Sequence, residues 1–406
     1  MHLVAIVNGP GEVAGWMLPL VERLKARSPE SRVTAVLTPC QYASGRERDV
    51  VAASPAVDDV LTFGGFVRRA WRNRRHLGAP HQPRTVVMHF GGDPFYAMIA
   101  AAMLRAPAWR YGTSCRGLMR TDRFLVPDDR TRVKLVQRGV DPGRVNVVGQ
   151  LVVDSVPPAA ANTVHETSSQ DREEHIVLMP GSRRFELAFM LPFYERVLDA
   201  LRARCPRATF TMPIAPFVSR NLFFDIAASA RYAVDTGADG LWLVTPRGTS
   251  CRLVEGDPYA VLRAGDVAVT LPGTNTLQLA VLGVPYLVLL PLNRGENIPL
   301  EGLAGWVLPA FRPFGLFRRY VTWWINRRID YVALPNILAG EAVVPELRGV
   351  LEPGAVADQV AELLADPARR AAMSARLRQI AGPPGAADRM VTALLETQEI
   401  PSESGS

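Results

Sequence analysis

Short apolar runs alternate along this chain with longer segments in which apolar and polar positions repeat at helical spacing. Leu3 to Val7 is such a run, and similar runs recur at 32–37 and 85–89. Runs of four to eight apolar residues are typical of strands buried on both faces of a parallel sheet. The segments between them, such as 18–25 and 97–104, predict helices. This alternation predicts βαβ units and a doubly wound α/β sheet.

The pattern stops between 157 and 175, where Pro, Ala, Ser, Thr and Glu dominate as they do in linkers. It then resumes with an expected strand at 176–179 and a helix at 192–204. We therefore predict an N-terminal Rossmann-like domain at 1–156, a linker at 157–175 and a second such domain at 176–380. A C-terminal helix and a disordered tail are expected at 381–406. Further strands are expected at 123–126, 146–148, 208–212, 241–245, 267–270 and 285–290, and further helices at 355–364 and 367–380.

The charge balance and the cysteine content limit the classes of partner and of site that we expect. The 46 Lys and Arg exceed the 39 Asp and Glu, for a net charge of +7. This excess favours nucleic acid, phosphorylated small molecules or an acidic membrane, although a solvated basic surface gives the same number. The 4 cysteines form no CxxC pair, which argues against a zinc site or a disulfide framework and fits a reducing cytoplasm. We find no secretory leader and no apolar run of roughly 18 to 20 residues.

Two glycine turns in the second half follow expected strands. Pro180-Gly181-Ser182-Arg183 stands where a helix should begin, and the amides of a helix N-terminus with an Arg bind phosphate well. An ordinary turn in which Arg183 pairs with Glu186 is the alternative. The second turn, Gly273 to Gln278, is rich in hydroxyl and amide groups. It lies where ligands bind in open α/β sheets, unless Thr274 or Asn275 simply caps a helix.

Two stretches in the first half also follow expected strands and are candidate ligand-binding loops. Gly9 to Gly15 is rich in glycine but is not GxGxxG, so a dinucleotide fingerprint is weakly supported. His89 and Asp93 lie at the end of an expected strand. A carboxylate there can accept a proton from a hydroxyl group, or Asp93 can cap the next helix with Pro94 at its first position.

Arginine and large apolar side chains are interleaved in two segments, 66–76 and 302–328. This composition fits an amphipathic surface on anionic lipid, or stacking on nucleic-acid bases, or core aromatics with solvated arginines. No nucleic-acid-binding module is recognisable, so we expect no nucleic-acid partner. The residues expected at the membrane surface are Arg68, Arg69, Trp71, Trp323 and Trp324.

The ordered set of these motifs resembles the lipid A disaccharide synthase family, a family of bacterial glycosyltransferases that use UDP-2,3-diacylglucosamine. The resemblance is carried by 11–15, 179–183, 273–277, 330–340 and 344–347, in the same order and at similar spacing. It implies a GT-B fold, with two Rossmann-like domains facing a cleft. It also implies an inverting hexosyltransferase with no metal or other cofactor, attached to the cytoplasmic face of the inner membrane. A UDP-sugar donor, a lipid or glycolipid acceptor and a possible homodimer follow from the same likeness.

The resemblance also assigns residues to roles. Arg183 would contact the diphosphate as UDP leaves, and Asp93 is the candidate general base. The expected donor site comprises Gly181, Ser182, Arg183, Gly273, Thr274, Asn275, Thr276, Gln278 and Asn336, and the acceptor-side loop comprises Gly11, Glu12, Gly15 and His89.

Four departures from the family pattern indicate a divergent member. Trp16 and Gln278 stand where the family usually has Asp and Glu, and Gly149-Gln150-Leu151 replaces Gly-His-Pro, with Asp154 retained. The loop around Asp93 is also shortened, which leaves its register open by a residue or two. A UDP-sugar 2-epimerase with a soluble substrate, or a binding protein without catalysis, are the alternative functions.

Overall fold

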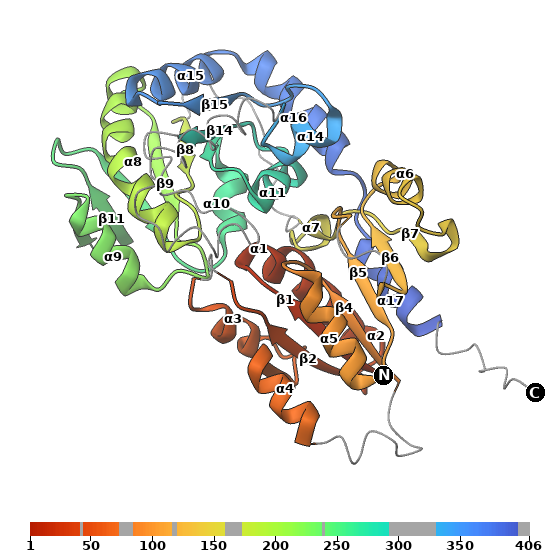
Figure 1. The fold of residues 1–406 in the computed structure, drawn as a ribbon. Coiled ribbons are helices and arrows are strands. Elements are labelled where there is room, and N and C mark those ends of the chain that lie inside the picture. Colours follow the sequence, from red (N-terminus) through yellow and green to blue (C-terminus); the bar gives the residue numbers. More distant parts are fainter. Residues whose placement is uncertain are drawn as a thin grey trace, which may run out of the picture. The chain divides into compact units, whose positions relative to one another are not determined.

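The computed structural model describes residues 1–40, 44–72, 84–115, 120–158, 173–237, 240–291 and 330–396. The chain forms two compact units. The first comprises Met1–Ser155 with Gly382–Ser406, and the second comprises Val156–Ala381. Each carries one sheet with helices around it (Figure 1).

The first unit is built on a parallel sheet of 7 strands in the order β3-β2-β1-β4-β5-β6-β7. Continuous apolar runs explain the central strands, because β1 and β4 are buried almost throughout. The strands are β1 His2–Val7, β2 Arg32–Leu37, β3 Asp59–Thr62, β4 Thr85–His89, β5 Ala108–Tyr111, β6 Arg123–Val126 and β7 Val145–Val147.

The helices of the first unit include one that changes its winding. A helix that begins at Pro10 passes through a π-helical turn at Val13–Met17 before it becomes α2. Helices α4 and α5 share a buried cluster with one face of the sheet, which includes Ile6 and Val87. The α-helices are α1 Pro10–Glu12, α2 Leu18–Arg27, α3 Glu47–Ala53, α4 Phe63–Arg72, α5 Pro94–Leu104, α6 Asp129–Gln137, α7 Leu151–Asp154 and α17 Ala386–Glu396, with a 3-10 turn at Pro142–Arg144.

The second unit has a sheet of 8 strands in the order β10-β11-β12-β9-β8-β13-β14-β15. The pairs from β12 to β15 are parallel, whereas β10, β11 and β12 pair antiparallel at one edge. The strands are β8 His175–Leu178, β9 Thr209–Pro213, β10 Ala233–Gly237, β11 Gly240–Val244, β12 Ser250–Val254, β13 Val267–Thr270, β14 Tyr286–Pro291 and β15 Glu346–Gly349.

One helix of the second unit begins earlier than the sequence predicts. The amphipathic pattern was expected from Pro192, but α8 runs from Arg184 to Arg204 with Pro192 inside it, so the helix begins directly after the turn at 180–183. The Glu186 carboxylate accepts a hydrogen bond from the amide of the N-cap residue Arg183, which fixes the start of the helix. The proline removes one backbone hydrogen bond without ending the helix. Helix α8 packs against α15 (Figure 1). The α-helices are α8 Arg184–Arg204, α9 Arg220–Ser229, α10 Pro258–Ala264, α11 Thr274–Leu282, α14 Leu334–Ala339, α15 Pro353–Ala365 and α16 Pro367–Ala381.

Both sheets have a point where the order of the strands reverses. In the first unit it lies between β1 and β4, and in the second between β8 and β13. Ligands of open α/β sheets bind beyond the carboxyl ends of the strands at such points. The fold therefore directs attention to the loops that follow these four strands.

Candidate active site

The loops after β1 and β4 meet at the reversal point of the first sheet. Asn8 and Glu12 follow β1, and Gly91 and Gly92 follow β4. A Cβ placed on Gly91 would lie 2.6 Å from Glu12 Cγ, and one on Gly92 would lie 2.8 Å from Asn8 Nδ2. The two glycines therefore make room for two polar side chains of the opposite loop. Gly92 also has a φ of 81°, which other residues adopt only with strain.

His89 lies at the end of β4 and is only 2% exposed. Neither ring nitrogen has a hydrogen-bond partner, although the backbone groups of Gly91 and Asp93 lie near enough to affect the ring. Burial, with a smaller contribution from Arg110, lowers the pKa of His89 to about 3. The ring is therefore neutral at physiological pH and a poor proton acceptor.

Asp93 caps the helix that follows it. Its Oδ1 accepts a hydrogen bond of 2.9 Å from the Phe95 amide, and Pro94 occupies the first turn of α5. The side chain is exposed. The capping alternative is confirmed, and the general-base role of Asp93 stays a prediction.

The remaining residues of the first loop lie on the helix that begins at Pro10. Gly11 is in α1, and Gly15 and Trp16 are in the π-helical turn. Single π turns are frequent at functional sites. Trp16, one of the departures from the family, packs edge-on against Tyr111 at 5.5 Å between ring centroids.

In the second unit, Gly181, Ser182 and Arg183 lie between β8 and α8. The Glu186 carboxylate accepts hydrogen bonds from the Ser182 amide at 2.8 Å and the Arg183 amide at 3.1 Å. It also pairs with Arg183 Nη1 at 3.0 Å. The ion pair that sequence analysis gave as the alternative is therefore present, and the contact of Arg183 with a ligand stays a prediction.

The turn between β13 and α11 is held by its own side chains. Asn275 Nδ2 donates to Thr270 Oγ1 and to the Leu271 carbonyl, and Thr276 Oγ1 donates to the Gly273 carbonyl at 2.7 Å. No side chain caps α11, whose N-cap is Gly273, so the capping alternative is wrong for Thr274 and Asn275. Thr274 begins α11, and Gln278, one turn later, donates to Tyr259 Oη at 2.9 Å.

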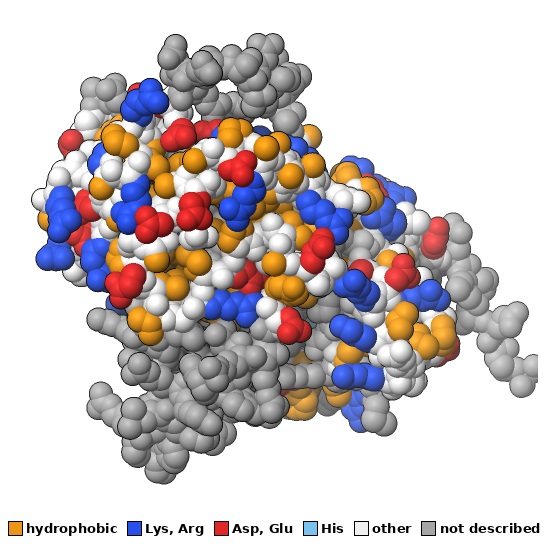
Figure 2. All heavy atoms as spheres, turned by 90° about the horizontal axis from the view of Figure 1, so that it is seen from above, with side chains coloured by type: hydrophobic (Ala, Val, Ile, Leu, Met, Phe, Trp, Pro, Cys, Tyr) orange, Lys and Arg blue, Asp and Glu red, His pale blue; other side chains and the backbone are white. Residues whose placement is uncertain are grey.

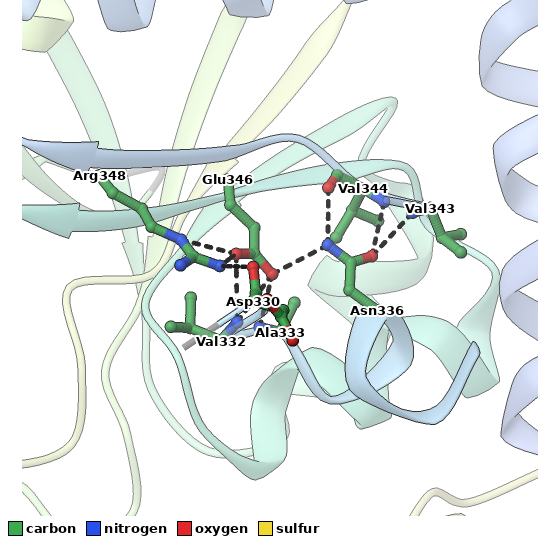
Figure 3. A network of polar contacts seen from close by, with 8 residues as sticks. All are labelled: Asp330, Val332, Ala333, Asn336, Val343, Val344, Glu346 and Arg348. Atoms are coloured by element: carbon green, nitrogen blue, oxygen red, sulfur yellow. Dashed lines mark hydrogen bonds and ion pairs between the residues drawn. The ribbon is translucent and has the colours of Figure 1, made fainter. Parts of the chain in front are cut away.

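Asn336 is fully buried, and its amide group is used entirely within the protein (Figure 3). Its Nδ2 donates to the Val344 carbonyl and to Glu346 Oε1, and its Oδ1 accepts from the Val343 and Val344 amides, all at 2.9 Å. A primary amide has two donors and one acceptor oxygen with two lone pairs, so this set saturates it. The geometry therefore gives Asn336 a structural role in which it ties α14 to β15.

Glu346 and Arg348 complete this network and were missed by sequence reasoning. The Glu346 carboxylate accepts from the Val332 and Ala333 amides and pairs with Arg348, whose Nη2 donates to the Asp330 carbonyl at 2.7 Å (Figure 3). Leu334 N donates to Thr276 Oγ1 at 3.2 Å, which links α14 to α11. The motif 344–347 was visible in the sequence, but nothing there indicated a buried carboxylate at the start of a strand.

The structure describes three of the five residues that are expected at the membrane surface. Arg68, Arg69 and Trp71 lie on α4, where Trp71 is 68% exposed and Arg69 pairs with Asp59 at 3.1 Å. Trp323 and Trp324 lie outside the described residues. On the face in Figure 2, basic and acidic side chains are interspersed, so the net charge is not gathered there in one patch.

Neither a cluster of metal ligands nor a membrane-spanning helix occurs among the described residues. No group of three or more His, Cys, Asp or Glu in them is arranged to hold a metal ion. No helix among them combines the length and apolarity that a membrane span needs.

The sequence of this chain is similar to those of lipid-A-disaccharide synthases. A family model described as lipid-A-disaccharide synthetase matches residues 142–294. Lipid-A-disaccharide synthase of Syntrophus aciditrophicus is 28% identical over 70% of this chain, and that of Anaeromyxobacter sp. (strain K) 31% over 71%. These alignments span 64% and 66% of the relatives, slightly less than two thirds of their length. With the enzyme of Geobacter sulfurreducens, the identity is 28% and 97% of each chain is covered.

Solved structures share the fold. UDP-GlcNAc 2-epimerase from Neisseria meningitidis, solved with UDP-GlcNAc, matches at a TM-score of 0.59 and 16% identity over 98% of this chain and 100% of its own. Acinetobacter baumannii MurG matches at 0.50 and 13%, with the same coverage. Identities this low establish the fold alone, which is GT-B. The sequence relatives show that this chain is similar to lipid-A-disaccharide synthases over most of its length.

Proposed function

We propose that this protein is an inverting hexosyltransferase that transfers a sugar, an acylated glucosamine in the family, from a UDP-sugar to a lipid-linked acceptor. The observation that carries the proposal is the position of Arg183. In this chain, which resembles lipid-A-disaccharide synthases, Arg183 stands at the N-terminus of α8, beside the reversal point of the second sheet. A guanidinium and helix amides at that point suit a nucleoside diphosphate.

In this proposal, the donor binds at the loops after β8 and β13. Arg183, together with the amides of the first turn of α8, stabilises the charge that develops on UDP as it departs. The turn from Gly273 to Gln278 lies at the same edge of the sheet and offers hydroxyl and amide groups for the rest of the nucleotide. Asn336 contributes by holding α14 in place, because its own polar atoms are occupied. The reaction as proposed needs no metal or other cofactor.

The acceptor side is proposed to be the first unit, with Gly11, Glu12, Gly15 and His89 near the acceptor. An anionic membrane surface is proposed to bind α4, where Arg68 and Trp71 are exposed. We place the protein in the cytoplasm, peripheral on the inner face of the plasma membrane. A homodimer is part of the proposal through the family likeness alone.

The test combines nucleotide binding with turnover. A UDP-selective rise in melting temperature is expected for the wild type and not for Arg183→Ala, because a ligand of the native state stabilises it. Arg184→Ala is the matched control, since this neighbouring arginine is exposed. Incubation with UDP-2,3-diacylglucosamine and acylated glucosamine acceptors should release UDP and form a disaccharide.

The same assay separates the alternatives. Epimerisation of UDP-GlcNAc without an acceptor would replace the proposal with the 2-epimerase function, whose present support is a shared fold. UDP binding without turnover on any acceptor would favour a binding protein.

A further inference from the structure

We propose that Glu12, rather than Asp93, is the general base that accepts the proton of the acceptor hydroxyl. This inference rests on the proposed function and names the catalytic carboxylate of its acceptor side. In the step, a Glu12 carboxylate oxygen takes the hydroxyl proton as the acceptor oxygen bonds to the anomeric carbon of the donor. The bond from that carbon to the UDP oxygen breaks, and its electron pair leaves with UDP.

The position of Glu12 supports this role. It lies in the first turn of the helix that begins at Pro10, at the carboxyl end of β1 and beside the reversal point of the first sheet. Its carboxylate lies over two glycines, because a Cβ on Gly9 would be 2.9 Å from Oε2 and one on Gly91 would be 3.1 Å from Oε1. The missing side chains of these glycines therefore let the Glu12 carboxylate lie close to the backbone of both loops, which fixes its position at the carboxyl ends of β1 and β4.

The lack of a partner for the Glu12 carboxylate among the described residues also supports its role as general base. Glu12 is the third residue after the N-cap Gly9, where a glutamate often closes a capping box, but no side-chain capping bond forms here. Among the described residues, neither a hydrogen bond nor an ion pair engages its carboxylate, which is half-buried. A base must have a lone pair directed at the proton it accepts, and this side chain has one available.

The other candidates in these loops are less suited. Asp93 is exposed, and one of its oxygens caps α5 through the Phe95 amide. His89 is 2% exposed and already a weak base. Asn8 is not a base, but its Oδ1 is buried without a partner beside Gly92, so this loop pair offers an acceptor for a substrate hydroxyl or amide.

The experiment compares Glu12→Gln with Asp93→Asn in the UDP-release assay, with UDP-2,3-diacylglucosamine and an acylated glucosamine acceptor. Loss of a general base reduces turnover by about 100-fold to 10,000-fold, so kcat of Glu12→Gln should fall within that range. KM for the donor should be unchanged. Glu12→Asp should recover part of the loss, and the acidic limb of the wild-type kcat–pH profile should disappear in Glu12→Gln. Asp129→Asn, an exposed carboxylate of the same unit, is the control for charge.

A second pair of variants tests the position of the carboxylate without removing it. Gly91→Ala should displace Glu12 and lower kcat while UDP still raises the melting temperature. Gly64→Ala is the matched control, because nothing lies within 4 Å of a Cβ there.

Near-normal turnover of Glu12→Gln together with loss in Asp93→Asn would overturn the assignment of Glu12 and leave the proposed function standing. Absence of UDP release by the wild type with every acceptor would overturn both.

Discussion

At the scale of single residues, several buried polar side chains in this protein hold loops in place through hydrogen bonds. Glu346 is the clearest case, since its carboxylate receives two backbone amides, the Asn336 amide and Arg348 (Figure 3). The side chains of Glu346 and Arg348 are only 7% and 18% exposed. Removing one partner of a buried, hydrogen-bonded ion pair leaves the other charge without compensation.

Glu346→Gln should therefore destabilise the second unit by about 3 to 5 kcal/mol, because the amide cannot replace the charge or accept all these bonds. Urea unfolding measures the change. Glu341→Gln is the matched control, since the Glu341–Arg376 pair is exposed, and such pairs contribute about 0 to 1 kcal/mol. Equal effects of the two substitutions would show that the network of Figure 3 does not stabilise the fold.

His89 leads to a prediction about pH. Its pKa is about 3 in the folded protein, mainly through burial, against 6.5 when unfolded. The unfolded state therefore binds more protons between these values, so the free energy of unfolding falls as pH drops through that window. Between pH 7.5 and 5, this group should cost about 2 kcal/mol. His89→Gln should show a loss smaller by that amount in urea unfolding at the two pH values, and an identical loss would contradict the prediction.

At the scale of elements, the periodicity of the sequence predicts the long, apolar strands well. Strands 32–37, 85–89, 123–126 and 267–270 have the expected bounds. Strands of mixed composition were not foreseen, because a segment such as Glu346–Gly349 has no continuous apolar run. The edge hairpin of β10 and β11 was foreseen only in its second strand, since every residue of β10 is exposed.

Helix α17 shows what periodicity cannot reveal. It packs against α2 and α7 of the first unit, more than 200 residues away in sequence. Asp154 accepts hydrogen bonds from the Gly385 and Ala387 amides, both at 2.6 Å, and Asp388 pairs with Arg23 at 2.5 Å. The sequence predicts a helix near this end of the chain but gives no signal for the surface it covers.

Asp154→Ala should loosen α17, because two amides lose a charged acceptor, and hydrogen bonds to charged groups contribute about 1.5 to 3 kcal/mol each. Hydrogen exchange of the α17 amides should accelerate, while that of α15 and α16 in the second unit should not change. Asp141→Ala, which removes a carboxylate bonded to the Gly143 amide elsewhere in the first unit, is the control. Unchanged exchange in α17 would show that its apolar face alone holds it.

At the scale of the whole molecule, sequence motifs predict which loops come together better than they predict what each side chain does. The order of strands places the loops at 9–12 and 91–93 at one reversal point, and those at 181–183 and 273–278 at the other. Motif spacing anticipates this, since ligand loops follow strands. The saturated amide of Asn336 and the open carboxylate of Glu12 depend on contacts between distant segments, so the sequence alone does not assign their roles.

The net charge of +7 belongs to the same scale, because it leads to a prediction for the entire protein at a membrane. Helix α4 presents Arg68 and Trp71 to solvent, and each basic residue near an anionic bilayer contributes about 1 kcal/mol. Arg68→Glu should therefore weaken binding to phosphatidylglycerol vesicles at least fivefold in a sedimentation assay, and Trp71→Ala should weaken it at every salt concentration. Raising the salt should release the wild type, since screening shortens the range of the attraction. Arg48→Glu makes the same charge change on α3 of the same unit. Equal losses from Arg48→Glu and Arg68→Glu would mean that net charge, and not the surface of α4, governs the association.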